Sequence, residues 1–475
     1  MKKTLLIFSL CVSMFASLTA AAQDTPYTLN VFNKVTYYGM YGELTTEPVP
    51  PGMIRMSNSS YSKMLTQEQL DSFGNTLTMK VTLNPLCDNY DRIGNVNMVL
   101  VPKEQTSYSY NDSNIKRIEI GRFITPFMRL TVQNPNSVPY EYELDNLTNI
   151  FHDAAITAQY NIWIELEVYG YQGGPGQGGA AVEIPICANR KDVYMGSLEF
   201  TSTDNPQVVY GNDNFLLPLS YKYQLRDYVL EGVDEEGNPV EGTQVLDETV
   251  KTITFTLDEA LPNAVLHLIT SNHGANQGGE EYVRRDHFIY LDNNPVLTYK
   301  PGGKSCEPFD QYNTQPNCVY LICTNTGSSP RPDTDAAWSW NNWCPGDKIP
   351  NRVIELGALS AGTHTFKIDV PGAVFAGDQG YFPLSVYLQS VTTTLGTKEF
   401  STTAFSVYPN PVTDVATIET KGAEIKLVTV VNTLGQTVFT GTSDKVDMSQ
   451  LQSGIYMVKV QFDNNQTGVK KIVKN

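Results

Sequence analysis

The chain has 475 residues, of which 41% are hydrophobic, 11% aromatic and 17% charged, and its formal net charge is −17. This composition supports a large core and excludes wholesale disorder, and the negative charge argues against nucleic acid as a partner. The length is enough for two or three domains of roughly 100–200 residues each.

The first segment, residues 1–22, has the pattern of a secretory signal peptide. Lys2 and Lys3 precede an apolar run, and three alanines form a small-residue cleavage site before Gln23. The run is too short to span a membrane, and no later segment reaches that length. We therefore expect an exported chain that is soluble outside and has no transmembrane segment.

Nearly every later segment alternates with a period of two and ends at Gly, Asn, Asp or Pro. Examples are residues 116–123, 160–171, 251–259 and 363–370. Such short alternating strands indicate antiparallel sandwiches, and helical periodicity is almost absent, with residues 65–73 as the best candidate. The predicted fold class is all-β.

Composition shifts suggest where the domains divide. A strand-rich block follows residues 187–197, and a linker composition near 396–404 precedes a compact C-terminal unit. We expect four parts, namely the signal peptide at 1–22, domains at 23–190 and 191–398, and a small domain at 399–475.

The stretch CDNYDR, residues 87–92, separates two predicted buried strands at 76–83 and 94–101. It combines a thiol, two carboxylates, an aromatic ring and a guanidinium, whereas loops more often carry Gly, Asn and Ser. This density of reactive groups makes the loop a candidate functional site.

A second candidate lies on the predicted strand 162–168. Trp163, Glu165 and Glu167 are spaced i, i+2, i+4 and therefore share one face. A Trp ring can stack on a sugar while neighbouring carboxylates accept hydroxyl hydrogen bonds. A solvent-facing side of the strand explains the pattern equally well.

The third candidate is the segment 280–292, which follows a polar, Gly-containing loop at 271–279. It carries Glu281, Arg285 and His287. A surface ion-pair ladder of little energetic value is the alternative interpretation.

Several chemistries find no support in the sequence. HExxH and GxSxG motifs are absent, the five histidines are scattered, and no CxxC occurs, so we predict no metal site. A copper monooxygenase would need clustered His and Met ligands.

The cysteines after residue 22 indicate disulfides, and the sequence leaves their pairing open. They are Cys87, Cys187, Cys306, Cys318, Cys323 and Cys344.

The C-terminal unit contains FSVYPNPVTD (405–414), VVNTLGQTVFTG (430–441) and LQSGIYMVKV (451–460), followed by a terminal KKIVKN. In this order the motifs resemble the sorting domain of type IX secretion cargo, a small Ig-like β-sandwich; an ordinary β-sandwich adhesion domain is the alternative. The resemblance implies the type IX machinery as a partner. It also implies passage through the periplasm and outer membrane to a secreted or surface-attached state.

Residues 87–96, 120–128, 280–289 and 341–356 resemble, in order and spacing, the matching stretches of the peptide:N-glycosidase F family. These amidases remove N-linked glycans from asparagine. The resemblance covers roughly 27–391. It implies two adjacent antiparallel eight-stranded jelly-roll sandwiches with the active site between them.

Carried over by position, the resemblance implies that Asp91, Glu165 and Glu281 are the catalytic carboxylates and that no cofactor is needed. The implied substrate-binding residues are Arg92, Tyr90, Trp163, Glu167, His273, Arg285 and Trp340. His273 and Glu167 stand where the family has Trp, and Trp340 stands where it has Arg. These departures bear on the accepted glycan more than on the reaction.

The resemblance also implies a Cys323–Cys344 disulfide, and we assume Cys306–Cys318 and Cys87–Cys187 as the remaining pairs. The expected protein is a monomer that acts on N-linked glycoproteins or glycopeptides and cleaves the amide between Asn and N-acetylglucosamine. Glu165 and Glu281 would approach from opposite domains, and the sequence leaves open which one positions water.

A non-catalytic glycan-binding or adhesion protein on the same fold is the alternative function. The replaced tryptophans favour it. The three retained carboxylates argue against it, because binding alone does not require them.

Overall fold

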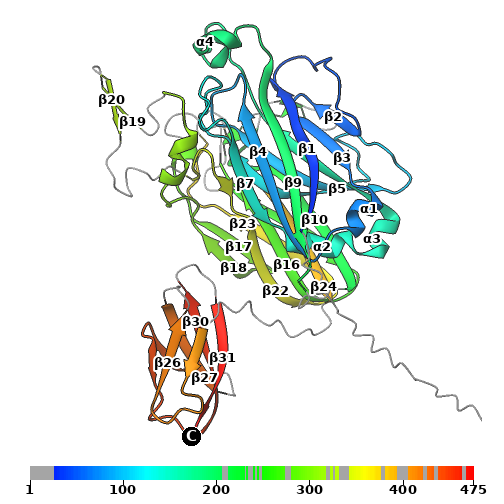
Figure 1. Ribbon diagram of the computed structural model, residues 1–475. Coiled ribbons are helices and arrows are strands. Elements are labelled where there is room, and N and C mark those ends of the chain that lie inside the picture. Colours follow the sequence, from blue (N-terminus) through cyan, green and yellow to red (C-terminus); the bar gives the residue numbers. More distant parts are fainter. Residues whose placement is uncertain are drawn as a thin grey trace, which may run out of the picture. The chain divides into compact units, whose positions relative to one another are not determined.

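The structure is a computed structural model (Figure 1). It describes residues 26–205, 212–229, 232–233, 239–240, 243–244, 249–272, 280–316, 321–324, 327–330, 342–375, 380–392, 405–420, 425–432, 437–462 and 467–475. The expected signal peptide and the residues His273, Cys318 and Trp340 lie outside these ranges. The described residues up to 392 belong to one unit and those from 405 onward to a second unit.

The first sandwich pairs a four-stranded sheet with a six-stranded sheet, and all pairings are antiparallel. The first sheet contains, in order, β1 (Tyr27–Tyr38), β9 (Asp192–Thr203), β4 (Thr76–Pro85) and β7 (Val138–Glu143). The second contains β2 (Met53–Ser57), β3 (Ser60–Met64), β8 (Tyr160–Val168), β5 (Ile93–Pro102), β6 (Lys116–Ile124) and β21 (Lys348–Ile349). Because β9 lies in this sandwich, the first sandwich extends past the boundary that we expected at residue 190.

The second sandwich pairs two four-stranded sheets. One contains β10 (Asn212–Leu225), β24 (Phe382–Thr392), β16 (Leu261–Thr270) and β22 (Arg352–Leu359). The other contains β15 (Val250–Leu257), β23 (Gly362–Asp369), β17 (His287–Leu291) and β18 (Asn294–Tyr299). Short hairpins pair β11 (Tyr228–Val229) with β14 (Thr243–Gln244), β12 (Gly232–Val233) with β13 (Pro239–Val240), and β19 (Leu321–Thr324) with β20 (Gly327–Pro330).

Helical segments are short and lie between strands. They are α1 (Gln67–Asp71), α2 (Asp145–Phe151), α3 (Ala154–Gln159), α4 (Ala180–Glu183), and the 3₁₀ turns η1 (Pro185–Cys187), η2 (Glu280–Tyr282) and η3 (Glu307–Tyr312). The expected helix within 65–73 forms as α1, where the Thr66 side chain accepts a hydrogen bond from Gln69 N. No described helix is long and apolar enough to cross a membrane.

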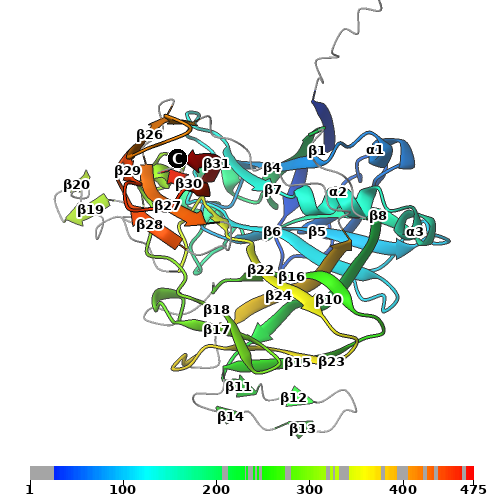
Figure 2. The same cartoon turned by 90° about the horizontal axis from the view of Figure 1, so that it is seen from below.

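The four large sheets stack as successive layers (Figure 2). In the outermost sheet of the first sandwich, β7 alternates between buried and exposed residues, as expected for a sheet with one solvated side. In contrast, β5 is buried almost throughout, because Tyr221 of the second sandwich contacts Asn97 while Tyr108 and Trp163 cover Val99 and Val101. β21 strengthens this junction, since Ile349 pairs with Arg122 in β6 although it comes from the second half of the chain.

The C-terminal unit is itself a sandwich of seven described strands in two sheets. One sheet contains β25 (Phe405–Tyr408), β26 (Val415–Thr420) and β29 (Lys445–Asp447), and the other β28 (Thr437–Gly441), β27 (Ile425–Asn432), β30 (Gly454–Phe462) and β31 (Thr467–Lys474). Residues such as Val430, Val458 and Phe462 form its core. The predicted all-β fold, with two sandwiches and a small C-terminal sandwich, is confirmed.

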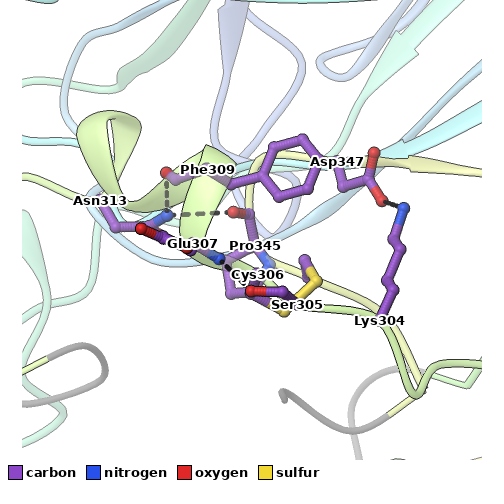
Figure 3. The surroundings of a disulfide bond; sticks show 9 residues. Lys304, Ser305, Cys306, Glu307, Phe309, Asn313, Pro345 and Asp347 are labelled. Atoms are coloured by element: carbon purple, nitrogen blue, oxygen red, sulfur yellow. Dashed lines mark hydrogen bonds and ion pairs between the residues drawn. A yellow bond between two sulfur atoms is a disulfide. The ribbon is translucent and has the colours of Figure 1, made fainter. Parts of the chain in front are cut away.

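Two disulfides occur among the described residues. Cys87–Cys187 is bonded as assumed. The pairs Cys323–Cys344 and Cys306–Cys318 were wrong, because Cys344 bonds to Cys306, whose Cα lies 5.4 Å away and so within bridging range. Figure 3 shows this bond beside the Asn313 amide, which donates to the carbonyls of Phe309 and Pro345.

Candidate active site

The loop 87–92 is organised around Asp88, which is completely buried. Asp88 Oδ1 accepts a hydrogen bond from Tyr90 N at 2.9 Å, and Oδ2 accepts from Tyr171 N at 2.7 Å and from Arg92 Nε at 2.8 Å. The Cys87–Cys187 bond fixes the start of the loop. Burial opposes the charge of Arg92, but the Asp88 carboxylate outweighs it and raises the pKa of Arg92.

The other side of the loop is held by the first sandwich. Thr125 Oγ1 accepts from Arg92 N at 2.7 Å, and the hydroxyl of Tyr194 donates to the carbonyl of Tyr90 at 2.8 Å. The Arg92 guanidinium also lies 5.6 Å from the centre of the Tyr90 ring. The backbone on both sides of the half-buried Asp91 is therefore fixed.

In the second sandwich, η2 carries Glu281, which is buried. The Asn342 amide donates to the carbonyls of Glu280 and Glu281 at 2.9 and 3.2 Å. The Glu280 carboxylate receives two hydrogen bonds from Arg285, at 2.9 and 2.7 Å, and one from Val374 N. Arg285, predicted to bind substrate, is thus engaged in bracing the turn that presents Glu281.

The loop 87–92 and the η2 turn come close enough for their charges to act on one group. Burial, then the negative charge of Glu281, then that of Asp91, raise the pKa of Tyr282 to about 12. Asp91 belongs to the first sandwich and Glu281 to the second. Carboxylates from both sandwiches therefore act on the Tyr282 hydroxyl.

Glu165 is in a different environment, because it is fully buried and both carboxylate oxygens are bound. Oε1 accepts from Arg117 Nη2 at 2.8 Å and from the Tyr108 hydroxyl at 2.7 Å. Oε2 accepts from Arg117 Nε at 2.9 Å and from Asn97 Nδ2 at 2.8 Å. Asn97, which pairs with Glu165 in the sheet, lies about 13 Å along β5 from Ile93, at roughly 3.3 Å per residue. Ile93 directly follows the loop 87–92.

Trp163 shares the face of Glu165, as its spacing predicted, but this face is covered. Trp163 is buried, and its ring packs edge-on against Tyr108 at 5.5 Å between centroids, beside Val99 and Val101. It offers no open surface for stacking. Sequence spacing identified the shared face correctly but not the elements that lie over it.

Glu167, on the same face, is bound by Lys222 of β10 and by the Tyr221 hydroxyl at 3.3 Å. Burial raises the pKa of Glu167, but the Lys222 ammonium outweighs this effect, and the net pKa is lowered. Lys222 has a backbone φ of 46° at an irregularity in the pairing of β10 with β24. A non-glycine residue in this left-handed conformation is uncommon and is often found at functional positions.

Lys222 also lines a cavity of about 520 Å³ between the two sandwiches. Its Nζ lies 3.4 Å from the hydroxyl of Tyr169, another lining residue. The full lining comprises Met40, Tyr41, Arg92, Ile93, Tyr110, Arg122, Tyr169, Lys222, Gln224, Tyr381 and Pro383. Cavities of this size and of mixed polar and aromatic lining are typical of small-ligand sites.

The structure thus places Tyr90, Asp91 and Arg92 in one hydrogen-bonded loop, with Asp91 and Glu281 both acting on Tyr282, whereas Glu165 and Trp163 are enclosed by partners of their own. Sequence reasoning missed Asp88, although it lies within the singled-out loop, and it missed the cavity residues Lys222 and Tyr169. An ordinary alternating strand gives no signal for the latter two. Among the described residues, no group of three or more His, Cys, Asp and Glu side chains is arranged to hold a metal ion.

The fold and site define a protein of two packed jelly-roll sandwiches that presents carboxylates from both at their junction. A family model described as peptide-N-glycosidase F, N terminal, matches residues 28–170, and its C-terminal counterpart matches 242–389. The chain belongs to the peptide:N-glycosidase F family. Residues 406–475 match a secretion system C-terminal sorting domain, which implies export through the outer membrane to a secreted or surface location.

Solved structures share the fold at low sequence identity. PNGF-II, in C2 and P21 crystal forms, is 20% and 21% identical with TM-scores of 0.51 and 0.50. In both comparisons 78% of this chain is covered, and the chain spans 66% of the length of PNGF-II. PNGase F, a glycosylasparaginase from Flavobacterium meningosepticum, is 16% identical over 78% of this chain and 97% of its own, with a TM-score of 0.45. No curated protein matches the chain.

Proposed function

We propose that this protein hydrolyses the amide bond between asparagine and the first N-acetylglucosamine of N-linked glycoproteins or glycopeptides. The observation that carries the proposal is that hydrogen bonds fix the backbone around two carboxylates from different sandwiches, Asp91 in the loop 87–92 and Glu281 on η2, both of which act on Tyr282. Membership of the peptide:N-glycosidase F family supports the same reaction class. The proposed site uses side chains of both sandwiches.

The reaction adds water across the side-chain amide of asparagine. The water oxygen bonds to the amide carbon, the carbon–nitrogen bond breaks, and the nitrogen leaves with the sugar as a glycosylamine while asparagine becomes aspartate. Glu281 orients the water and accepts one of its protons, and Asp91 transfers the other, from the hydroxyl of the tetrahedral intermediate, to the leaving nitrogen. Arg92, fixed by Asp88, provides positive charge for the oxygen of the tetrahedral intermediate.

This assignment gives Glu165 a supporting role. Arg117, Tyr108 and Asn97 already occupy both of its oxygens, so positioning water falls to Glu281. Glu165 instead holds β6 and β8 together through a buried ion pair. Removing one partner of such a pair is costly, because the other charge stays buried without compensation.

The cavity is the proposed place for part of the glycan. Tyrosine side chains on its wall combine an aromatic face with a hydroxyl, which suits a sugar ring and its polar substituents. Tyr169 is held there by Lys222, which in turn is bound to Glu167. In this proposal the cavity tyrosines contact the sugar in place of the tryptophans that the family has at positions 167 and 273.

A glycan-binding protein without turnover is the second candidate. The enclosure of Glu165 favours it, because one of the three carboxylates expected to serve catalysis is sealed in an ion pair. In that case the cavity would hold a glycan without cleavage of the amide.

The two candidates are separated by mass spectrometry of a denatured N-glycoprotein incubated with the protein in heavy-oxygen water. Conversion of glycosylated asparagine to labelled aspartate supports the amidase. Asp91→Asn should then slow the reaction by about 10²–10⁴, the share of a general acid–base group. Asp258→Asn, at an exposed turn, is the matched control. Intact glycopeptides across all glycan types would favour the binding protein, and an unimpaired Asp91→Asn variant would refute the role of Asp91.

A further inference from the structure

A carboxylate outside the predicted site joins three separate parts of the chain. Glu183, the last residue of α4, accepts hydrogen bonds on Oε2 from Asn89 Nδ2 at 2.8 Å and from Gln315 Nε2 at 2.7 Å. Oε1 accepts from Gly179 N at 3.2 Å and from the Tyr90 hydroxyl at 3.5 Å. The carboxylate as a whole therefore joins the start of α4, the loop 87–92 and the second half of the chain.

Two of these donors come directly before the proposed catalytic residue in the chain. Asn89 and Tyr90 directly precede Asp91, and Asn89 is completely buried. A covalent tie reinforces the contact, since Cys187, four residues after Glu183, is bonded to Cys87 at the start of the loop. The disulfide fixes one end of the loop, and Glu183 fixes the part next to Asp91.

Gln315 connects the same carboxylate to a hydrogen-bonded segment of the second half. Gln315 N donates to the Phe127 carbonyl at 2.8 Å, and Asn313 Oδ1 accepts from Phe127 N at 2.9 Å. The Asn313 amide group donates to the carbonyl of Pro345, next to the Cys306–Cys344 bond (Figure 3). Glu183 therefore links the loop to a segment that a disulfide holds in place.

We propose that Glu183 is a positioning residue that fixes Asp91 at the junction by holding Asn89 and Tyr90 against Gln315. This inference rests on the proposed function. A carboxylate is needed because all four of these groups donate, and hydrogen bonds to an ionised acceptor are about twice as strong as neutral ones. A glutamine here would turn an amide N–H₂ toward at least one donor and lose that hydrogen bond.

The test compares the full chain with Glu183→Gln and with Glu104→Gln, an exposed glutamate in the same sandwich. Misplacement of a reacting group by about 1 Å can cost 10²-fold in rate. Glu183→Gln is therefore expected to lower kcat by about 10–10² while KM changes less than about threefold. Glu104→Gln should leave both unchanged.

Hydrogen exchange of the intact proteins gives a readout that does not depend on activity. Glu183→Gln should accelerate exchange in 87–92 and in 306–316 together, with β5 and β8 unchanged. Unchanged exchange in 87–92 would overturn the proposal, even with a lower kcat, since Glu183 would then act on substrate directly. Acceleration throughout the first sandwich would also overturn it, because that indicates a general loss of stability.

The proposed function and this inference fail separately. If the wild-type protein releases no glycan but Glu183→Gln still loosens both segments together, Glu183 retains its link between loop and second half and the amidase proposal fails. If the wild type is active and the variant changes neither kcat nor exchange, only the positioning role is refuted.

Discussion

Arg92 Nε lies 2.8 Å from Oδ2 of Asp88, a carboxylate with no solvent exposure. The pair spans the loop 87–92 from within, with Asp91 between its members. Because Asp88 also accepts backbone hydrogen bonds from Tyr90 and Tyr171, it sets the shape of the loop as well as the direction of the guanidinium. The loop thus carries its own internal support.

Asp88→Ala should therefore impair the site without altering Asp91 itself. Loss of a hydrogen-bonded charge that leaves its partners unpaired costs about 1–3 kcal/mol. We expect the free energy of unfolding to fall by this amount in urea titrations and the amidase rate to fall with it. Asp204→Ala, an exposed aspartate, is the control. Normal activity of Asp88→Ala would show that the loop keeps its shape without the pair.

Glu165→Gln should chiefly lower stability, whereas Glu281→Gln should chiefly lower activity. Glu165→Gln leaves Arg117 buried without its countercharge, so the free energy of unfolding should drop by about 3–5 kcal/mol. Glu281→Gln should chiefly reduce the rate. Denaturant unfolding and glycopeptide hydrolysis, measured on both variants, check this contrast. A stable but inactive Glu165→Gln variant would instead restore Glu165 as a catalytic carboxylate.

The double variant Arg117→Met/Glu165→Leu is the matched control for that experiment. Replacing both members of a buried ion pair by apolar residues is often neutral, whereas removing one is not. We expect this double variant to be more stable than Glu165→Gln. Equal stability of the two would mean that the unpaired Arg117 charge is not the cause of the loss.

His267 should make the protein lose stability in mild acid. Burial lowers its pKa to about 4, and its ring stacks on Tyr387 at 4.5 Å. Below about pH 6.5 the unfolded chain binds a proton that the folded chain does not, so stability is full above pH 6.5 and is lost toward pH 4, by about 3 kcal/mol. His267→Phe should show a smaller loss over this range in urea titrations. Parallel pH curves for the two proteins would contradict the prediction.

The Cys306–Cys344 bond should contribute measurably to stability. It closes a loop with a sequence separation of 38, for which loop-closure entropy predicts up to about 4 kcal/mol. The double variant Cys306→Ala/Cys344→Ala should unfold at correspondingly lower denaturant concentration. Peptide mapping without reduction should recover Cys306 linked to Cys344, and a peptide that links Cys323 to Cys344 would contradict the structure.

Alternating patterns predicted the all-β fold because one side of each outer strand faces water. They could not reveal that β5 and β8 are covered on both sides, since that depends on packing of the second sandwich. Trp163 and Glu165 were placed on one face, as spacing predicted, but the alternation does not show that residues of the first sandwich cover that face. Their partners Tyr108 and Arg117 come from elsewhere in the chain, and no local pattern identifies them.

The pairing of Cys306 with Cys344 and the role of Asp88 escaped prediction for a related reason. Several connectivities fit the same cysteines, and only the three-dimensional path of the chain distinguishes them. Asp88 is recognisable as a loop carboxylate, but one of its hydrogen-bond donors, Tyr171, lies 83 positions away. Asp91 and Glu281, in contrast, were singled out through the resemblance of their segments to the peptide:N-glycosidase F family, and their roles remain predictions.

The pairing of β21 with β6 means that the two sandwiches are not interchangeable modules. A shortened protein that ended after β9 would leave β6 as an open sheet edge, with its backbone groups free to pair with neighbouring molecules. It would also expose the polar face of β5 and β8 that the second sandwich covers. Gene fusions or library shuffling that treat the first sandwich as self-sufficient should therefore produce aggregating proteins, whereas exchanges that keep both halves in one polypeptide preserve a complete sheet.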